Sequence, residues 1–331
     1  MPLPPLRFVA LALVAVVTAA SQAMADPPAD PNSTITIQLE NDSTNPGSDR
    51  YYTSGERIGY TSPTGAVPAP LAWLGHSLLG DGQQRLAVEL SQNIYSPYFD
   101  GDPVPPPGDR PYAAVLLATT SLIQDTDTTR TALGLGLGVI GPAAQGEEVQ
   151  NGFHGLIGQG KVSGWDSQIG NQPVIQLTAD RTWRLPLSGI GGLESDVLPS
   201  VTAGAGTFRI YGQAGGSIRL GQGLNSDFGA ARIHPGLTGT DAYVQTEPFV
   251  WYVFAGVDGQ AIAWDETLDG LPFATSRNVG RQPFVGEFQA GFTIIAYGVR
   301  FTAMQVVQSN EFKTQRNPIF QFSSASVSVK F

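Results

Sequence analysis

Large apolar residues alternate with small or polar residues along most of this chain. Near the start of the alternation, Ile35, Ile37 and Leu39 are separated by threonine and glutamine, and near its end Val327 and Val329 are separated by serine. Successive side chains of a β-strand point to opposite faces, so this period of two predicts strands with one apolar and one polar face. We therefore expect an all-β fold.

Twelve segments carry the pattern, and an even number of antiparallel strands suits a closed barrel. A soluble β-sandwich would alternate in the same way, but a sandwich solvates its outer faces. Here apolar faces recur throughout and the chain ends on Phe331, as in bacterial outer-membrane barrels. We predict a transmembrane antiparallel β-barrel with strands at 33–41, 51–62, 84–95, 111–123, 130–140, 172–184, 195–206, 209–221, 247–258, 284–295, 297–308 and 320–331.

The connections between these strands indicate where function lies. Long loops at 96–110, 141–171 and 259–283 are expected on the outer rim, where barrels carry their functional loops. Segments 63–82 and 222–246 are also long. Successive connections of such a barrel alternate between the two rims, and this order places both segments at the inner rim. Inward faces rich in glycine, with few charges, predict a filled or narrow lumen, which argues against a passive porin.

Composition excludes several functions. The formal net charge of −10 and the lack of a basic tract argue against nucleic acid as a partner. With no cysteine, the chain has neither a thiol nucleophile nor a sulfur ligand for a metal. A basic start, a short apolar run and Ala23-Met24-Ala25 predict a signal peptide at 1–25. The mature barrel domain would then cover 26–331 and lie in the bacterial outer membrane after cleavage near Ala25.

One loop carries a helical pattern instead. Between Gln145 and Ile157, apolar side chains at helical spacing predict a short helix whose apolar stripe lies against the barrel wall. Gln150 and His154 share a neighbouring face. Histidine ordinarily titrates near neutrality, so His154 is a candidate general base for water, although a lone histidine on a loop helix is also an ordinary surface or capping residue. The stripe consists of Val149, Phe153, Leu156 and Ile157.

A second polar cluster lies where the first two predicted strands meet. The first strand runs into Glu40-Asn41-Asp42, and the second begins with Tyr51-Tyr52-Thr53. By parity Asn41 lies on the lipid-facing side, where an uncovered amide is costly, so we expect the loop helix to cover it. Asn41 and Asp42 are equally consistent with a simple turn. The remaining histidines, His76 and His234, stand near no recognisable nucleophile, which argues against a serine–histidine phospholipase.

Several motifs in order along the chain carry a family resemblance. They are ENDSTN at 40–45, DRYYTSG at 49–55, IYSP at 94–97, DRPYA at 109–113, GVIGPAAQGEEVQNGFHGLIG at 138–158 and VFAGVDG at 253–259. Together with the last strand, they resemble the outer-membrane lipid A 3'-O-deacylase family over nearly the whole mature chain.

The resemblance implies a specific chemistry and partner. Family members hydrolyse the ester-linked 3' acyl chains of lipid A, the membrane anchor of lipopolysaccharide, by a calcium-dependent mechanism similar to that of secreted phospholipases A2. By this resemblance His154 is the general base, Asp42 is the calcium ligand, and Asn41, Thr53 and Gln150 belong to the active site. We expect the barrel to be a monomer.

The chain departs from the family pattern at two places. The loop after the IYSP motif has no basic residue before Arg110 to meet a lipid phosphate, so Arg110 or Lys161 would have to substitute. A carboxylate expected shortly after the histidine is replaced by Gly158, Gln159 and Gly160. These departures leave open a second interpretation, a catalytically degenerate barrel with a structural or lipid-binding role.

Overall fold

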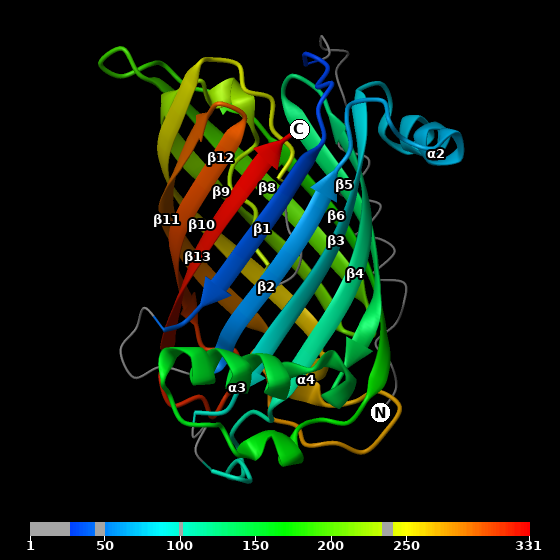
Figure 1. Ribbon diagram of the computed structural model, residues 1–331, viewed down its shortest axis with the longest axis vertical. Helices are drawn as coiled ribbons and strands as arrows, with labels where there is room; N and C mark the ends of the chain where they lie inside the picture. The colour runs from blue at the N-terminus through cyan, green and yellow to red at the C-terminus, as the bar shows by residue number, and fades with distance from the viewer. Residues whose placement is uncertain (1–26, 44–49, 99–101, 234–240) are drawn as a thin grey trace.

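The chain forms a closed antiparallel β-barrel, shown from the side in Figure 1. The computed structural model describes residues 27–43, 50–98, 102–233 and 241–331, and the predicted signal peptide lies outside these ranges. The strands are β1 (Thr34–Asn41), β2 (Tyr51–Thr61), β3 (Gln83–Ser96), β4 (Ala113–Asp125), β5 (Thr129–Ile140), β6 (Gln172–Trp183), β7 (Leu185–Pro186), β8 (Glu194–Gly206), β9 (Arg209–Gln222), β10 (Phe249–Asp265), β11 (Phe284–Ala296), β12 (Val299–Ser309) and β13 (Ile319–Lys330).

Twelve of these strands make up the ring, as predicted. The first and last strands, β1 and β13, pair along their length, and the pairing of β6 with β8 closes the barrel. The two-residue β7 pairs with the start of β8. Strand ends agree with the prediction within two residues, except that β10 continues to Asp265. The prediction ended this strand at Asp258. In the structure Asp258 pairs with Arg232 at 3.1 Å inside the barrel, and the strand continues past this charged residue.

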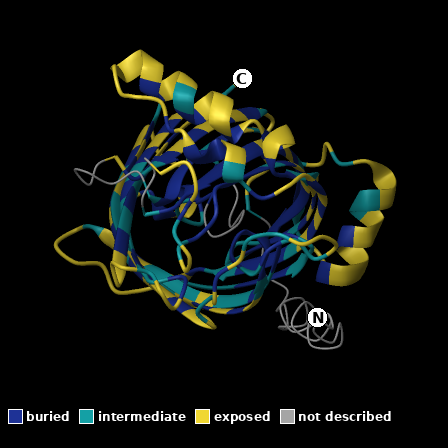
Figure 2. Cartoon of the chain, turned by 90° about the horizontal axis from the view of Figure 1, so that it is seen from below, coloured by how far each residue is buried: buried dark blue, intermediate teal, exposed yellow. Residues whose placement is uncertain are grey.

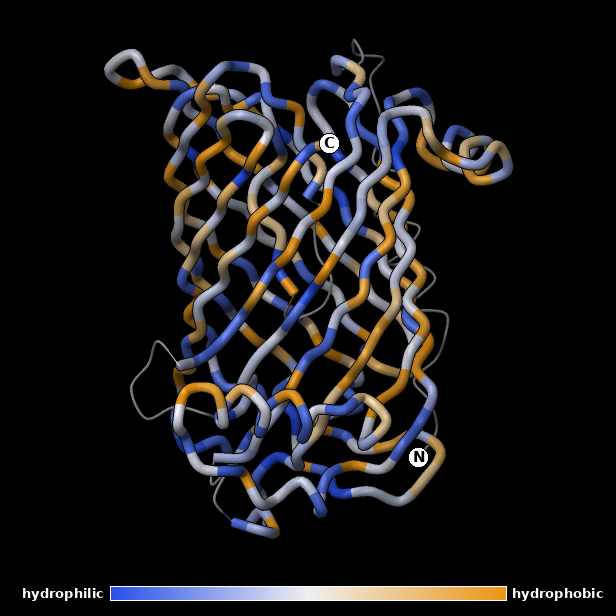
Figure 3. The backbone as a smooth tube through the Cα atoms, in the orientation of Figure 1, coloured by the Kyte–Doolittle hydropathy of each residue, from blue (hydrophilic) through white to orange (hydrophobic). Residues whose placement is uncertain are grey.

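The outer face of the barrel is apolar. Along β1, Ile35, Ile37 and Leu39 are exposed while the residues between them are buried, and β13 and β11 repeat the pattern. Figure 3 shows this alternation as bands of colour along the strands. An outward apolar belt of this kind is solvated by lipid, so the alternation has the physical origin that the sequence predicted.

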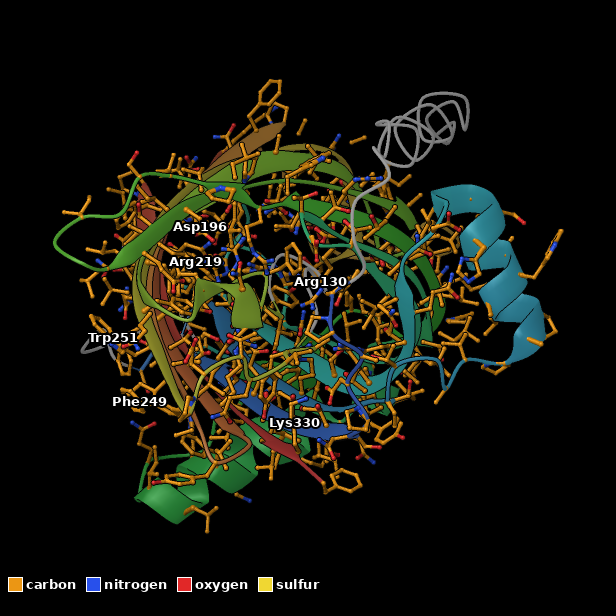
Figure 4. All side chains as sticks on the ribbon, turned by 90° about the horizontal axis from the view of Figure 1, so that it is seen from above. Arg130, Asp196, Arg219, Phe249, Trp251 and Lys330 are labelled. Carbon is orange, nitrogen blue, oxygen red and sulfur yellow. The ribbon has the colours of Figure 1, made fainter. Side chains whose placement is uncertain are left out.

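The lumen is filled, but the prediction that it carries few charges is wrong. Arginines from many strands project inward and pair with buried carboxylates; Figure 4 shows Arg130, Asp196 and Arg219 inside the ring, with Phe249 and Trp251 at its outer side. The Arg219 guanidinium bonds Asp196 at 2.6 Å. The charged residues lie at alternate positions of the strands, among small residues. In the sequence the inward faces therefore appeared to be rich in glycine and poor in charge. The pairing lowers the cost of burial.

The long connection between β9 and β10 fills part of this lumen. It begins with a 3-10 turn, η3 (Leu224–Ser226), and its described residues contact the inward faces of the strands. The Ala231 carbonyl accepts a hydrogen bond from Gln38 at 2.9 Å, and the Ile233 amide donates to Glu40 at 2.9 Å. Asp241 contacts Arg57 of β2. This placement explains why the segment is long although it joins neighbouring strands at the inner rim.

The helices are short and lie at the two rims. They are α2 (Ala69–Leu79), η1 (Pro142–Ala144), α3 (Gly146–Ile157), η2 (Gly164–Ser167) and α4 (Glu266–Asp269). The helix α3 matches the predicted loop helix, whereas α2 was not predicted. Figure 1 shows α3 at the rim opposite the C-terminus and α2 at the other rim. No helix of the described residues is long and apolar enough to cross a membrane.

Candidate functional site

A cavity of about 340 Å³ lies between α3 and the outer wall of the barrel, where β1 and β2 reach the rim. It is formed by the end of β1, the start of β2 and one side of α3. All five predicted site residues line it. The lining comprises Leu39, Glu40, Asn41, Asp42, Ser43, Thr53, Ser54, Glu56, Val149, Gln150, Phe153, His154, Ile157 and Gln159.

The orientation of α3 agrees with the prediction except at one residue. Gly146, Gln150 and His154 form its buried side, and Val149, Phe153 and Ile157 of the predicted stripe line the cavity, partly exposed, whereas Leu156 is 86% accessible. Figure 2 shows the exposed side of the helices along the edge of the ring. The helix therefore covers Asn41, as predicted, because both line the cavity. At the rim of a membrane barrel, lipid can solvate the exposed part of the apolar helix face.

The start of α3 approaches the wall closely enough to require glycine. A Cβ on Gly146 would lie 2.4 Å from Ala114 Cβ and 2.6 Å from a ring carbon of Trp165. Such separations are far shorter than van der Waals contact. The glycine therefore allows the helix to pack directly on β4, and this sets the distance between the buried face of α3 and the hairpin of β1 and β2.

His154 is held by the loop that follows its own helix. The helix ends at Gly158, which has φ of 75°, and the chain then returns so that the Gly160 carbonyl lies 2.9 Å from His154 Nδ1. A carbonyl only accepts hydrogen bonds, so Nδ1 carries a proton, and in the neutral ring Nε2 carries the lone pair. The backbone carbonyl of Gly160 thus orients the imidazole.

Gln150 is fixed one turn before the histidine. Its Oε1 accepts a hydrogen bond of 2.9 Å from Nε1 of Trp165 on η2, and its Nε2 donates to Ser96 Oγ at 3.4 Å. Trp165 is itself buried against Tyr112, with ring centroids 5.3 Å apart. These contacts connect α3 both to its own loop and to the end of β3.

Opposite the helix, the hairpin of β1 and β2 is strained at its return. Tyr51 has φ of 65°, a left-handed conformation that is uncommon for a bulky side chain, and it is held by edge-on packing with Phe312 and Phe320. The pairing of β2 with β3 then shifts register between Tyr52 and Ser54. Bulges re-aim side chains, and this one contains Thr53.

The bulge joins three predicted site residues. The Thr53 carbonyl accepts from the Asp42 amide and from Asn41 Nδ2, both at 3.2 Å. Asp42 Oδ2 accepts from the amide of Arg50 at 2.9 Å. Asp42 and Asn41 therefore do make a turn, as the simpler interpretation held, and the same turn places their side chains on the cavity.

Sequence reasoning missed one acidic residue of the cavity, Glu56. It lies on β2 opposite Leu39 of β1, and the exposed Ile58 and Tyr60 share its outward face. A carboxylate in an outward-facing apolar stripe was visible in the sequence as a break in the alternation. Parity alone could have identified it.

The residues that line the cavity can be tested against a calcium ion. Among the described residues, no group of three or more His, Cys, Asp and Glu side chains is arranged to hold a metal. Calcium, however, accepts hydroxyl, amide, carbonyl and water oxygens beside carboxylates. Thr53 Oγ1 is buried and has no hydrogen-bond partner in the described part of the chain, and Asp42 lines the same cavity. These oxygens fit one part of a calcium coordination sphere.

The two basic residues suggested as substitutes do not lie on the cavity. Arg110 is fully buried, bonds Glu311 at 2.9 Å and stacks on Tyr95, and Lys161 is exposed on the loop after α3. A different pair of arginines lies near the hairpin. The guanidinium carbons of Arg50 and Arg316 lie 4.5 Å and 5.2 Å from the ring centroid of Tyr98.

These features define a class of protein: an outer-membrane β-barrel with a cavity of polar and apolar side chains on the lipid side of its outer rim. The chain belongs to the family described as outer membrane protein LpxR, whose model matches residues 8–331. This membership confirms the family resemblance read from the motifs.

Solved structures give the same result. The structure of LpxR from Salmonella typhimurium is similar with a TM-score of 0.75 and 25% identity, over 90% of this chain and 100% of that one. The β domain of the Bordetella autotransporter BrkA reaches a TM-score of 0.42 at 11% identity, over 92% of this chain and 100% of that one, and supports no functional argument. No curated protein sequence matches the chain.

Proposed function

We propose that this protein is a calcium-dependent esterase that removes the 3'-acyl group of lipid A, with His154 as the general base. The observation that carries the proposal is the position of the cavity. A buried histidine, a carboxylate and a hydroxyl that has no hydrogen-bond partner among the described residues line a space on the outer side of the barrel wall, at the level of the rim. A membrane lipid can reach that space without entering the lumen.

The apolar part of the cavity suits an acyl chain. Leu39 of the wall and Phe153 of α3 line it beside the polar groups, and both are partly exposed toward the lipid. An ester group could therefore enter between them while its hydrocarbon chain stays in the membrane. Apolar contact of this kind contributes binding energy in proportion to the area removed from water.

His154 would activate the attacking water. With Nδ1 held by the Gly160 carbonyl, Nε2 takes a proton from water as the water oxygen bonds to the ester carbonyl carbon. The bond between the former carbonyl carbon and the 3' oxygen of the sugar then breaks. The imidazolium returns the proton to this leaving alkoxide. The products are a free fatty acid and the 3'-hydroxyl of the sugar, and no covalent enzyme intermediate is needed.

The remaining residues hold this arrangement. Asp42 and Thr53 would hold the calcium ion, which supplies positive charge near the ester carbonyl when bound. Asn41 fixes the hairpin through its bond to the Thr53 carbonyl, and Gln150 presents an amide that Trp165 orients. Arg50 and Arg316, gathered around Tyr98, provide positive charge for a lipid phosphate in place of the missing loop residue.

The proposal is tested by mass spectrometry of lipid A after incubation with the refolded barrel in detergent. Parallel samples contain calcium or a chelator, and folding is verified by the heat-dependent shift of the barrel on gels. Loss of the 3' acyl group with calcium, and intact lipid with the chelator, is the expected result. Equal cleavage in both samples would contradict the calcium requirement.

A second candidate function is a barrel that binds lipid without cleaving it. Its supporting observation is that neither Arg110 nor Lys161 lines the cavity, so the family's phosphate contact is not reproduced at that place. Intact lipid A in both samples, together with a stable complex between lipid A and the folded barrel, would favour this function over the esterase.

A further inference from the structure

Glu56 occupies an unusual position for a carboxylate. It lies on the outward face of β2, between residues that face lipid, and its strand partner is the exposed Leu39. A charged group on the lipid side of a barrel is destabilising unless another group neutralises it. The position is therefore not explained by the needs of the fold.

The carboxylate points into the candidate site. Glu56 lines the cavity with Asp42 and His154, and its Oε2 is buried without a hydrogen-bond partner among the described residues. Asn41 of β1 is the nearest outward-facing residue diagonal to Glu56 of β2. The residue directly opposite Asn41 on β2 is Ser54. One oxygen of Glu56 is thus shielded from water in the same space that the proposed cation would occupy.

We infer that Glu56 is a second acidic oxygen ligand of the cation site. This inference rests on the calcium site of the proposed function. Calcium sites commonly combine several carboxylates, and Asp42 alone supplies one negative charge. A divalent ion would neutralise both carboxylates and remove the cost of burying Glu56.

The experiment measures calcium binding directly, by isothermal titration calorimetry on refolded wild-type protein and the Glu56→Gln variant. The matched control is Glu148→Gln, which removes an exposed carboxylate of α3 outside the cavity. We expect Glu56→Gln to weaken calcium binding at least tenfold and Glu148→Gln to bind like wild type. Wild-type affinity in Glu56→Gln would overturn the inference while leaving the proposed function intact.

A second variant separates metal binding from folding. Glu56→Leu restores the apolar stripe, so the metal-free barrel should unfold at a higher temperature than wild type, while added calcium should no longer raise that temperature. A calcium-induced rise equal to that of wild type would overturn the inference. Absence of calcium binding and of any calcium-induced rise in the wild type would instead overturn the calcium site of the proposed function, and the inference with it.

A separate observation concerns α2, which lies outside the ring of strands at the rim opposite α3 (Figures 1 and 2). Gly75 and Leu79 are its buried residues, and the helix has no Asp, Glu, Lys or Arg. Trp73 is 71% exposed, and Leu74 and Leu78 are exposed beside it. An uncharged helix that presents these side chains to water would be unfavourable.

The geometry points to a lipid surface as the occupant of this exposed side, specifically the headgroup region of the inner leaflet. The helix follows β2 and packs against β4, and the neighbouring strand β3 exposes Val88 and Leu90 on its lipid face. The apolar side of α2 is therefore continuous with the lipid-facing belt. Tryptophan favours the membrane–water interface, which suits the exposed Trp73 of this apolar helix.

The test uses the absence of native cysteine. Trp73→Cys, labelled with an environment-sensitive fluorophore, is reconstituted into phosphatidylcholine vesicles with quenchers placed near the headgroup or at the chain end. Asp81→Cys, exposed just after the helix, is the control. We expect stronger quenching of the Trp73 label by the headgroup quencher than by the chain-end quencher, and little quenching at Asp81. A Trp73 label that behaves as in water overturns the proposal and favours a protein partner.

Discussion

Nε1 of Trp165 donates a hydrogen bond of 2.9 Å to Oε1 of Gln150, and this contact joins the η2 turn to the buried face of α3. Gln150 precedes His154 by one helical turn, and both are buried. The indole therefore holds the helix that carries the proposed base. The position of the imidazole depends on a residue that does not itself line the cavity.

Trp165→Phe tests this dependence. The variant loses one buried hydrogen bond, which contributes about 1 kcal/mol, and it leaves the Gln150 amide without its donor. We expect the rate of lipid A deacylation to fall roughly tenfold or more, because small displacements of catalytic groups are costly, while the barrel remains folded. Trp183→Phe at the opposite rim is the control. Equal rates in the two variants would show that the contact does not position the site.

The arginines around Tyr98 predict a role in substrate affinity. Arg316→Gln should raise KM for bis-phosphorylated lipid A roughly tenfold with little change in kcat, because a charge-assisted contact to phosphate is lost. Lys313→Gln removes another exposed cation of the same loop and should have little effect. Kinetics on dephosphorylated lipid A give the decisive comparison: an equal loss there would mean that Arg316 does not act through phosphate.

Glu266 on α4 predicts a pH-dependent stability. Its carboxyl is fully buried, both oxygens lack hydrogen-bond partners among the described residues, and burial, with the nearby Asp265, raises its pKa to about 8. In the unfolded chain the Glu266 carboxyl ionises near its ordinary pKa. The contribution of the neutral, buried carboxyl to the free energy of unfolding is therefore fully present below that ordinary pKa. It is lost as the pH rises toward and through about 8.

Glu266→Gln should remove this dependence. The amide keeps the shape of the neutral acid, so urea unfolding midpoints of the variant and wild type should be similar at about pH 4 and diverge in favour of the variant at about pH 9. Parallel midpoints across the whole range would contradict the raised pKa of Glu266.

The lumen predicts a large cost for removing one carboxylate. Asp227 lies 2.6 Å from Arg219, 3.0 Å from Arg300 and 2.8 Å from the Tyr252 hydroxyl. Asp227→Ala would leave two buried guanidinium groups without this counter-charge and should lower the free energy of unfolding by about 3–5 kcal/mol. Asp102→Asn, on an exposed loop, is the control. An unchanged unfolding midpoint for Asp227→Ala would mean that the connection between β9 and β10 is not held by this cluster.

The fold was readable from the sequence because alternation is a local property. Each strand shows its own lipid face, and the motif around His154 carries its own helical period. The path of the connection that holds Asp227 was not readable, since its ion pairs join residues far apart in the chain. The α3 stripe around Phe153 was placed correctly against the barrel wall, although periodicity alone did not show that Leu156 would be exposed. Glu56 was readable by parity but was overlooked.

The proposed role of His154 is to activate water at the cavity between α3 and the barrel wall. The most direct test compares release of the 3' acyl chain by wild type and His154→Ala in calcium, with both barrels shown to be folded by their heat-dependent gel shift. We expect the variant to lose at least about 10²-fold in rate, the lower end of what a general base contributes. A folded His154→Ala barrel that releases the acyl chain at the wild-type rate would contradict it.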